Sequence, residues 1–282
     1  MFDFPLSSRA KRSGNGWVDI CPAHDDNSPS LSVAYKNGKL LLKCFAGCSF
    51  QEIVACVNNN TRYSRTIPLY ETRAIKYSYD DGILYNIIDG LRPIEKDTPV
   101  GKYLRSRGLD NYQDLKDLKY HPDLHYSRCK AYPAMVGIIK DGIKVIGVHR
   151  TFITQEGKKL EKKIWGKVSG GCIKLIDNNR SNIYVSEGIE NALSYIKLYP
   201  NNLSNISLYV ACNANNISNI SLPKRDKKEN SLTVIADNDE AGLTNSDKLL
   251  RRASKLGWRT FEFAPNSGDW NDELMKRIYA NG

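Results

Sequence analysis

Two stretches, YVSEG at residues 184–188 and VIADNDEAG at residues 234–242, decide the fold class of this chain. Each sets carboxylates directly after a short apolar run that is typical of a buried parallel strand. Open α/β folds place their ligands at the carboxyl edge of the sheet, so two such strands side by side bring their acids together. The stretches therefore predict that Glu187, Asp237 and Asp239 form one site. Hard cations such as Mg²⁺ or Mn²⁺ prefer such oxygen ligands, which indicates metal-assisted chemistry on phosphates.

From residue 183 onward, strand-like and helix-like patterns alternate. The expected strands end near residues 187, 211, 236 and 263, and the expected helices cover 189–198, 241–256 and 270–279. Alternation of this kind predicts an α/β fold whose parallel sheet is covered by helices on both faces. The segment 203–228, which is rich in Asn and Ser and has a basic end, is expected to be a variable connection.

A cluster of three cysteines and one histidine is the second strong pattern. Cys21 and His24 form one pair, and Cys44 and Cys48 form another after a spacer of nineteen residues. This spacing matches a structural Zn²⁺ site with three thiolates and one imidazole, which leaves no open position for a substrate. We therefore expect zinc to stabilise a small domain and to take no part in catalysis.

The residues around these two pairs predict a zinc-ribbon layout. Strand-like segments at 30–35 and 39–44, joined by a turn at 37–38, are expected to form a β-hairpin that brings the pairs together. Ser49 and Glu52 then have the form of a capping box, which predicts a short helix directly after the last ligand.

The charge of the chain indicates the class of its partner. There are 41 Lys and Arg against 31 Asp and Glu, a net charge of +10, which favours nucleic acid. Lys36 and Lys43 lie on the expected hairpin near Trp17, Tyr35 and Phe45, a mixture of charge and stacking surface that suits single-stranded nucleic acid. The alternative for these aromatic residues is simple packing in a small domain. No apolar stretch reaches the roughly 20 residues of a membrane helix, so we expect a cytoplasmic protein with no membrane partner.

A lysine-rich tract at residues 157–174 precedes the acidic motifs. Its six lysines surround Trp165 and a pair of glycines. Glycines let a backbone approach a phosphate and lysines supply charge, so we expect contact with nucleotide or template. The favoured residues are Lys163, Lys167, Gly170 and Gly171, together with Arg150 at the end of an earlier strand. The alternative is an exposed basic loop.

The order of these motifs resembles DNA primases of the bacterial and phage type, which pair a zinc-binding domain with a Toprim catalytic domain. The resemblance rests on CPxH at 21–24, PSLSV at 29–33, CFxxC at 44–48, EG at 187–188 and DxDxAG at 237–242. Three phrases between them are similar to primase and primase-helicase proteins of phages, plasmids and integrated elements: PVGKYLRSRGL at 99–109, IGVHRT at 146–151 and GKVSGG at 166–171.

The resemblance implies a role for each acid. Glu187 would act near the reacting phosphate as a general acid/base or a metal ligand, and Asp237 and Asp239 would hold Mg²⁺ or Mn²⁺. Asp269, in the phrase GDWND at 268–272, would be a further ligand, and Asp272 a weaker candidate. Asp269 also suits the N-terminal cap of the helix that follows, so both roles stay open.

These motifs predict four parts. They are a zinc-ribbon DNA-binding domain at 1–60, a linker at 61–96, an α+β N-terminal part of a primase core at 97–180 and a Toprim catalytic domain at 181–282. Within the third part we expect a helix capped by Thr98 and a hairpin that turns at residues 141–142.

The function that these patterns favour is that of a DNA primase, which makes short RNA primers on single-stranded DNA from nucleoside triphosphates for a phage, plasmid or other mobile element. A weakly active DNA-binding or helicase-loading factor and a Toprim nuclease are the alternatives. The sequence has no Gly-x-x-x-x-Gly-Lys-Ser/Thr loop, so a replicative helicase would be a separate protein.

Overall fold

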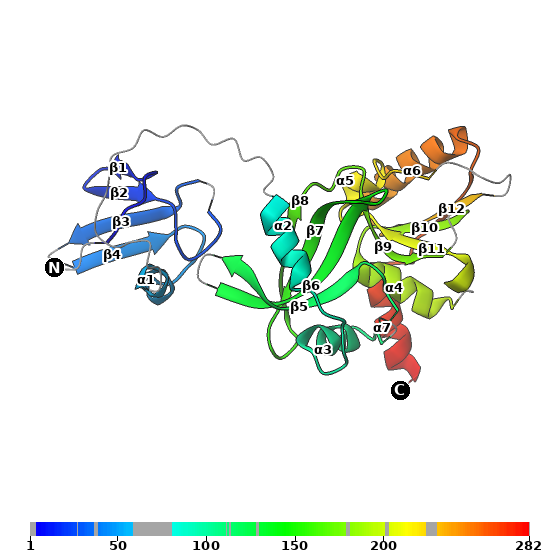
Figure 1. Ribbon diagram of the computed structural model, residues 1–282, viewed down its shortest axis with the longest axis horizontal. Coiled ribbons are helices and arrows are strands. Elements are labelled where there is room, and N and C mark those ends of the chain that lie inside the picture. The colour runs from blue at the N-terminus through cyan, green and yellow to red at the C-terminus, as the bar shows by residue number, and fades with distance from the viewer. Residues whose placement is uncertain are drawn as a thin grey trace. The chain divides into compact units, whose positions relative to one another are not determined.

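The computed structural model describes most of the chain (Figure 1). The described residues are 4–26, 28–36, 39–58, 81–110, 112, 114–127, 130–178, 181–200, 203–223 and 230–281. The chain forms two compact units, Met1–Tyr77 with Asp123–Tyr132 and Ser78–Pro122 with Pro133–Gly282. Most of the expected linker at 61–96 and the basic end of the 203–228 connection lie outside the described residues, and our four-part division stays a prediction.

The first unit holds a four-stranded antiparallel sheet and one helix. Its elements are β1 (Lys11–Ser13), β2 (Gly16–Asp19), β3 (Leu31–Lys36), β4 (Lys39–Cys44) and α1 (Phe50–Asn58). Leu31, Val33 and Ile53 are almost completely buried in its small core. The β3–β4 hairpin is confirmed, although its turn at 37–38 lies outside the described residues. The capping box is confirmed too, because the Glu52 N–H donates to Ser49 Oγ at 3.3 Å and the Ser49 N–H to Glu52 Oε2 at 2.9 Å.

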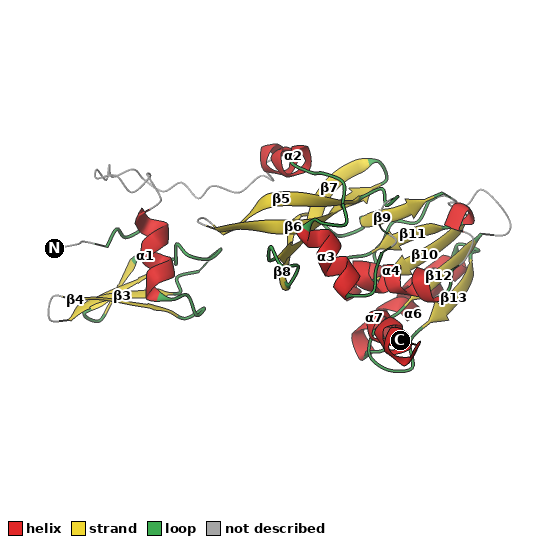
Figure 2. Ribbon diagram, turned by 90° about the horizontal axis from the view of Figure 1, so that it is seen from below, coloured by secondary structure: helices red, strands yellow, loops and turns green. Residues whose placement is uncertain are grey.

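The second unit is built on a nine-stranded sheet, whose strands are yellow in Figure 2. They are β5 (Leu118–Ser127), β6 (Lys130–Asp141), β7 (Lys144–Ile153), β8 (Lys159–Gly166), β9 (Cys172–Asp177), β10 (Asn182–Ser186), β11 (Ser207–Val210), β12 (Ser231–Ile235) and β13 (Arg259–Phe263). Their order is β13-β12-β10-β11-β9-β6-β7-β8, and β5 pairs with β6. The first four strands in this order run parallel, whereas β9, β6, β7 and β8 pair antiparallel.

Helices cover both faces of the parallel part of the sheet (Figure 1). One core includes side chains of α3 (Pro99–Ser106), α4 (Ile189–Leu198) and α7 (Trp270–Asn281), and the other includes α5 (Ala214–Ile217) and α6 (Glu240–Lys255). Alternate residues of β10 point to different cores: Ile183 and Val185 to the second, Tyr184 to the first. Among the described residues, this unit also has α2 (Asp81–Asp89) and a short 3₁₀ turn at Leu203–Asn205. The expected α/β fold class is confirmed.

Two local predictions between residues 97 and 153 are also confirmed. Thr98 Oγ1 accepts a hydrogen bond from the Gly101 N–H at 3.1 Å and so caps α3. The β6–β7 hairpin turns through Gly142, whose φ of +62° is a conformation that favours glycine. None of the described helices is long and apolar enough to cross a membrane.

Candidate functional site

The acids of the two opening stretches follow neighbouring parallel strands. Ser186 at the end of β10 pairs in register with Ile235 at the end of β12. Glu187 comes directly after β10, and Asp237 comes two residues after β12. Because the strands are parallel and in register, both carboxylates lie at one edge of the sheet, and both line the same pocket.

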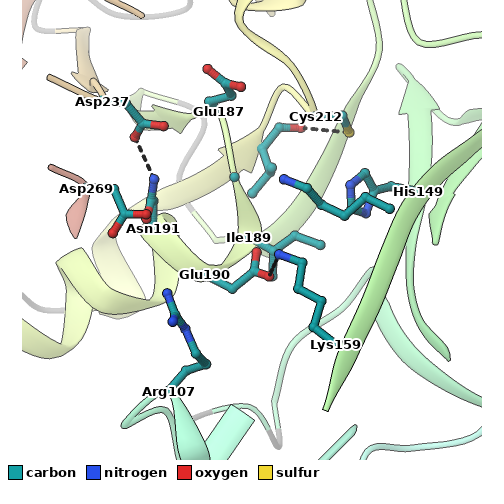
Figure 3. Close-up of a pocket in the computed structure, with 13 residues that line it drawn as sticks. Arg107, His149, Lys159, Glu187, Ile189, Glu190, Asn191, Cys212, Asp237 and Asp269 are labelled. Carbon is teal, nitrogen blue, oxygen red and sulfur yellow. Dashed lines mark hydrogen bonds and ion pairs between the residues drawn. The ribbon is translucent and has the colours of Figure 1, made fainter. Parts of the chain in front are cut away.

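This pocket has a volume of about 130 Å³ (Figure 3). Its acidic side chains are Glu187, Glu190, Asp237 and Asp269, and its basic side chains are Arg107, Lys159 and Lys162. In Figure 3, Asp237 and Asp269 lie on one side of the pocket and Lys159 on the other. A site with this separation of charge suits a ligand that is itself anionic and is bound through a cation on the acidic side.

Trp270 holds the start of α7 beside Asp237. Its Nε1 donates to the carbonyl oxygen of Ala236 at 3.0 Å, and Trp270 is 3% exposed. Ala236 precedes Asp237, and Asp269 precedes Trp270, so this single hydrogen bond brings the two aspartates to the same pocket.

Asn271 joins α7 to two further elements. Its Nδ2 donates to the carbonyl oxygen of Arg107 at 2.8 Å and to Ser194 Oγ at 2.9 Å. Arg107 is the C-terminal cap of α3, and Ser194 lies on α4. The side chain of Asn271 thereby fixes the backbone from which Arg107 reaches the pocket.

The acids repel one another in the absence of a cation. Burial, followed by the charge of Glu187, raises the pKa of Asp237 to about 6, although a hydrogen bond from Asn191 Nδ2 at 2.6 Å opposes this. Burial and the charge of Asp239 likewise raise the pKa of Glu187. A divalent cation between these carboxylates would remove the repulsion, so the residues present suit such an ion.

The spacing of the acids also bears on which ion they suit. In the described part of the chain, Cys21, His24, Cys44 and Cys48 are the one group of three or more possible ligands whose atoms all lie within 4.8 Å of one another. The pocket acids are therefore more widely spaced than a closed cage. Mg²⁺ is commonly held by one or two carboxylates, with waters and substrate phosphates completing its shell, and an open arrangement suits it.

Asp239 has a structural task that the sequence did not indicate. It is the N-cap of α6, and its Oδ1 accepts from the Gly242 N–H at 2.7 Å. A Cβ at position 242 would lie 2.8 Å from the carbonyl oxygen of Asp237, so only glycine allows this close turn. Asp239 is exposed and is not among the side chains that line the pocket.

Asp269 caps a helix and lines the pocket, and its role as a metal ligand stays a prediction. Its Oδ1 accepts from the Asp272 N–H at 2.8 Å, which caps α7, and its side chain also lines the pocket.

Replacing Asp269 with serine is expected to separate these roles, because serine is an equally good N-cap but has no charge. The midpoint of thermal unfolding should stay within about 2 °C of wild type, while the affinity for Mg²⁺ falls about 10-fold. Isothermal titration with Mg²⁺ and a melting curve test both statements. An unchanged Mg²⁺ affinity would leave Asp269 a helix cap alone.

The basic wall of the pocket comes from the β7–β8 pair. Thr151 on β7 is opposite Lys162 on β8, and His149 is opposite Ile164. Residues directly opposite each other share a face of the sheet, and His149 and Lys162 both line the pocket. This face of the pair therefore points to the acids.

A β-bulge adds a second lysine to this face. The register shifts between Phe152 and Ile153, so that Phe152 pairs with Glu161 but Ile153 pairs with Lys159. Leu160 is the additional residue. Without the shift, strict alternation would turn Lys159 away from the face that carries Lys162, and the bulge brings it into the pocket.

Arg150 and Lys163 occupy the opposite face. They pair with each other across β7 and β8, in alternation with the pocket-lining residues. The Arg150 guanidinium lies 5.5 Å from the ring centroid of Phe152 and 5.9 Å from that of Trp165. Lys163 Nζ lies 3.5 Å from Glu161. The structure does not bring these two predicted residues to the acids, and their contact with a nucleic acid stays a prediction.

The glycine pair is used within the protein. The Gly170 N–H donates to Asn216 Oδ1 at 3.0 Å, and the Gly171 N–H donates to the carbonyl oxygen of Val168 at 2.9 Å. Asn216 Nδ2 in turn donates to the carbonyl oxygen of Gly171 at 2.8 Å. Since both N–H groups have partners, neither is open to a phosphate. Lys167 is exposed, and its role stays a prediction.

Glu190 is a site residue that the sequence analysis did not select. It is 9% exposed on the first turn of α4, accepts from Tyr103 Oη at 2.7 Å and lies 3.2 Å from Lys159 Nζ. Burial alone would raise the pKa of Glu190, but Lys159 and the hydrogen bond from Tyr103 lower it to about 2. Its position three residues after Glu187, one helical turn away, was the available signal.

The four predicted zinc ligands lie together in the first unit. His24 Nδ1 lies 3.3 Å from Cys48 Sγ and 3.7 Å from Cys44 Sγ. The other ring nitrogen, Nε2, lies 3.7 Å from Asp26 Oδ2. A carboxylate behind a metal-binding histidine is a common second layer of such sites, and the sequence analysis did not select Asp26. Three thiols and one imidazole at these distances suit a tetrahedral ion with soft ligands.

Lys36 and Lys43 are both exposed on this small domain. Lys43 Nζ lies 5.6 Å from the ring centroid of Phe45, which is 67% exposed. Packing in the core, the alternative for the nearby aromatic residues, therefore does not apply to Phe45, whereas Trp17 does pack against the core of the first unit.

Comparisons with known proteins match two segments of the chain. Residues 83–175 match a domain of unknown function (DUF7146), and residues 182–278 match the Toprim domain. A search of curated proteins found no match. Among solved structures, the chain is similar to the primase fragment of the bacteriophage T7 primase-helicase protein, at 11% identity over 93% of this chain and 98% of that chain, with a TM-score of 0.40. It is also similar to the RNA polymerase domain of Mycobacterium tuberculosis primase DnaG, at 16% identity over 63% and 59% of the two chains, with a TM-score of 0.37.

The pocket is shared between the two matched segments. Arg107, Lys159 and Lys162 belong to the first, and the acids belong to the second. Glu187 and Asp237 follow strands in the parallel part of the sheet, which is covered by helices on both faces, as the sequence predicts. Residues 182–278, which carry the acids of this pocket, are the segment that matches the Toprim domain.

Proposed function

We propose that this protein is a DNA primase, which makes short RNA primers on single-stranded DNA from nucleoside triphosphates. The observation that carries the proposal is the pocket lined by acids of the Toprim domain on one side and by Lys159 and Lys162 on the other. Nucleotidyl transfer needs metal-holding acids beside phosphate-binding cations. The similarity of three central phrases to phage and plasmid proteins supports a role in replicating such an element.

The charged groups have separate tasks in this proposal. Mg²⁺ or Mn²⁺, held by the pocket acids Glu187, Asp237 and Asp269, with Asp239 as a further proposed ligand beside the pocket, would neutralise charge on the reacting phosphates and on the departing pyrophosphate. The alternative role of Glu187 is that of a general base: when its carboxylate is not bound to the ion, its pKa, which is raised by burial, suits it to take a proton from the attacking hydroxyl.

The two pocket lysines differ in how much charge they can offer a phosphate. Lys159 is partly neutralised by Glu190, from which its Nζ lies 3.2 Å away. Lys162 has no ion-pair partner among the residues that the structure describes. We therefore assign the main phosphate contact to Lys162.

Replacing Lys162 with methionine is expected to weaken the affinity for ATP·Mg²⁺ about 10-fold, because one direct phosphate contact is lost while the apolar stem is kept. Lys163→Met is the matched control, since the neighbouring lysine lies on the opposite face. Its affinity for ATP should stay within about 2-fold of wild type. Equilibrium titration of both variants gives the comparison, and equal losses would contradict the assigned faces.

In this proposal the first unit binds the single-stranded DNA template. One face of its sheet carries Leu31, Val33 and Cys44 toward the core. By alternation the other face carries Ser32, Lys43 and Leu41, and Leu41 is 48% exposed. Small and apolar groups between lysines, with Phe45 at the edge, suit stacked bases and their phosphates. Zn²⁺, bound by Cys21, His24, Cys44 and Cys48, would hold this sheet together.

Incorporation of labelled ribonucleotides on single-stranded DNA, with Mg²⁺ or Mn²⁺, tests the proposed activity. Wild type should give short RNA products and Asp237→Ala none. Absence of product from wild type would overturn the primase proposal. DNA cleavage that Asp237→Ala abolishes would favour a Toprim nuclease, and template binding without either reaction would favour a replication factor that works with a separate helicase.

A further inference from the structure

His149 is a buried polar side chain with one ring nitrogen, Nδ1, that the described residues leave without a hydrogen-bond partner. It lies on β7, is 6% exposed and lines the pocket, on the side away from Asp237 and Asp269 (Figure 3). Its Nδ1 is buried and has no hydrogen-bond partner among the described residues. A buried polar group without a partner is costly, so such groups are rare unless a ligand supplies the partner.

The surroundings of His149 keep its ring neutral. Burial, together with the charges of Lys162, Lys159 and Arg150, lowers the pKa of His149 to about 4, although the charge of Glu190 opposes this. A neutral imidazole does not compete with the neighbouring lysines for a phosphate. Its natural partner is a neutral group that can both donate and accept, and a hydroxyl has this property.

The neighbouring charges indicate which hydroxyl this is. The acids and Lys162 are placed to hold the triphosphate, and the sugar is the part of a nucleotide that is bonded directly to it. A fixed imidazole beside the phosphate site therefore meets the sugar before the base. A contact to the sugar also treats all four nucleotides alike, as copying of a template requires.

We propose that His149 hydrogen-bonds a ribose hydroxyl of the nucleotide in this pocket and makes the site prefer ribonucleotides. This inference rests on the proposed function, because it takes a nucleoside triphosphate as the ligand. A site built to hydrogen-bond a hydroxyl discriminates against an analogue that lacks it, because the polar group of the site is then left unpaired.

Equilibrium binding of ATP, 2′-deoxyATP and 3′-deoxyATP, each with Mg²⁺, tests the inference on the full chain. Wild type should bind ATP about 10-fold more tightly than the analogue that lacks the contacted hydroxyl, the value of one neutral hydrogen bond. The two analogues distinguish the 2′ from the 3′ hydroxyl. The His149→Leu variant should bind all three nucleotides with equal affinity, and that affinity should match the one that wild type has for the analogue without the contacted hydroxyl.

Two further variants separate this role from folding and from phosphate binding. His149→Gln keeps a neutral polar group and should retain part of the preference, and thermal unfolding checks that both His149 variants fold. Lys162→Met should weaken all three ligands by the same factor, because the triphosphate is common to them.

The possible failures are distinct. Equal binding of the three ligands by wild type, or an undiminished preference in His149→Leu, overturns the inference and leaves the primase proposal standing. Binding with the expected preference but without incorporation of ribonucleotides supports the inference and overturns the primase proposal. No binding of any of the three overturns both.

Discussion

Replacing Asp237 with alanine is expected to lower ribonucleotide incorporation at least about 100-fold, with little loss of folded protein. Asp237 lines the pocket, and burial, followed by the charge of Glu187, raises its pKa to about 6. Losing a group that holds charge in place during phosphoryl transfer typically costs this much. Incorporation measured at saturating Mg²⁺ gives the comparison.

Asp247→Ala is the matched control for this substitution. Asp247 is an exposed aspartate on α6 whose partner is Arg251, one helical turn away at 2.7 Å. An exposed pair of this kind contributes little to stability, and its loss should leave incorporation within about 2-fold of wild type. If Asp237→Ala were as active as Asp247→Ala, Asp237 would not hold the metal.

The same site predicts a gain in stability for Asp237→Asn in the absence of added Mg²⁺. The pKa of Asp237 is raised from 3.8 to about 6 in the folded protein, so ionisation costs the folded state up to about 3 kcal/mol. The penalty is absent below about pH 4, where the carboxyl is protonated in both states, and complete above about pH 6. The free energy of unfolding of the asparagine variant should therefore exceed that of wild type, and this difference should be larger at pH 7.5 than at pH 4.5.

Urea unfolding of the two proteins at both pH values measures this difference. The Asn191 hydrogen bond survives the substitution, because an amide oxygen can replace Oδ1 as its acceptor. Added Mg²⁺ should stabilise wild type more than the variant, and the difference in their free energies of unfolding should become smaller. A variant that is less stable than wild type at pH 7.5 would contradict the like-charge repulsion.

Replacing Cys44 with serine is expected to unfold the first unit and leave the second folded. The core of the first unit is small, and a structural zinc site of this type contributes about 10–16 kcal/mol to folding. Bound zinc should fall from one ion per chain to well below one. Limited proteolysis should then cut within residues 4–58 while a fragment that includes residues 133–281 persists.

Cys172→Ser is the control for this experiment. Cys172 is a free, buried thiol in the second unit, so its replacement should leave the zinc content at one ion per chain. A Cys44→Ser protein with full zinc content and a protease-resistant first unit would contradict the ligand assignment.

The acidic side of the site could be predicted from sequence because local patterns determine it. Glu187 and Asp237 each follow an apolar strand, and parallel strands in register bring their ends together whatever the rest of the fold does. The spacing of Cys21, His24, Cys44 and Cys48 likewise needs only one hairpin between the pairs. In both cases the sequence pattern that predicts the position of a side chain lies within a few residues of that side chain.

The basic side could not be predicted in the same way, because it depends on pairing between strands. Lys162 and Lys163 are equivalent by composition, and only the register of β8 against β7 separates them. Glycines were favoured as phosphate contacts for their small size, but Gly170 and Gly171 use their N–H groups on Asn216 and Val168. Asn216 lies far from Gly170 in the sequence, and Val168 lies in a turn that has no recognisable sequence pattern.

The bulge at Leu160 has a consequence for comparing this protein with its relatives. Two lysines point to the same side of the sheet although their positions differ by an odd number, which an uninterrupted strand does not allow. A homologue that lacks the additional residue has no bulge. It would keep a lysine in the place of Lys159 only if that lysine stood one position away from Lys159 in a sequence alignment. Equivalent residues along β8 should therefore be identified from which face of the strand they occupy. A one-residue gap in the alignment there, together with a lysine shifted by one position, would mean that the pocket lysine is kept and not lost.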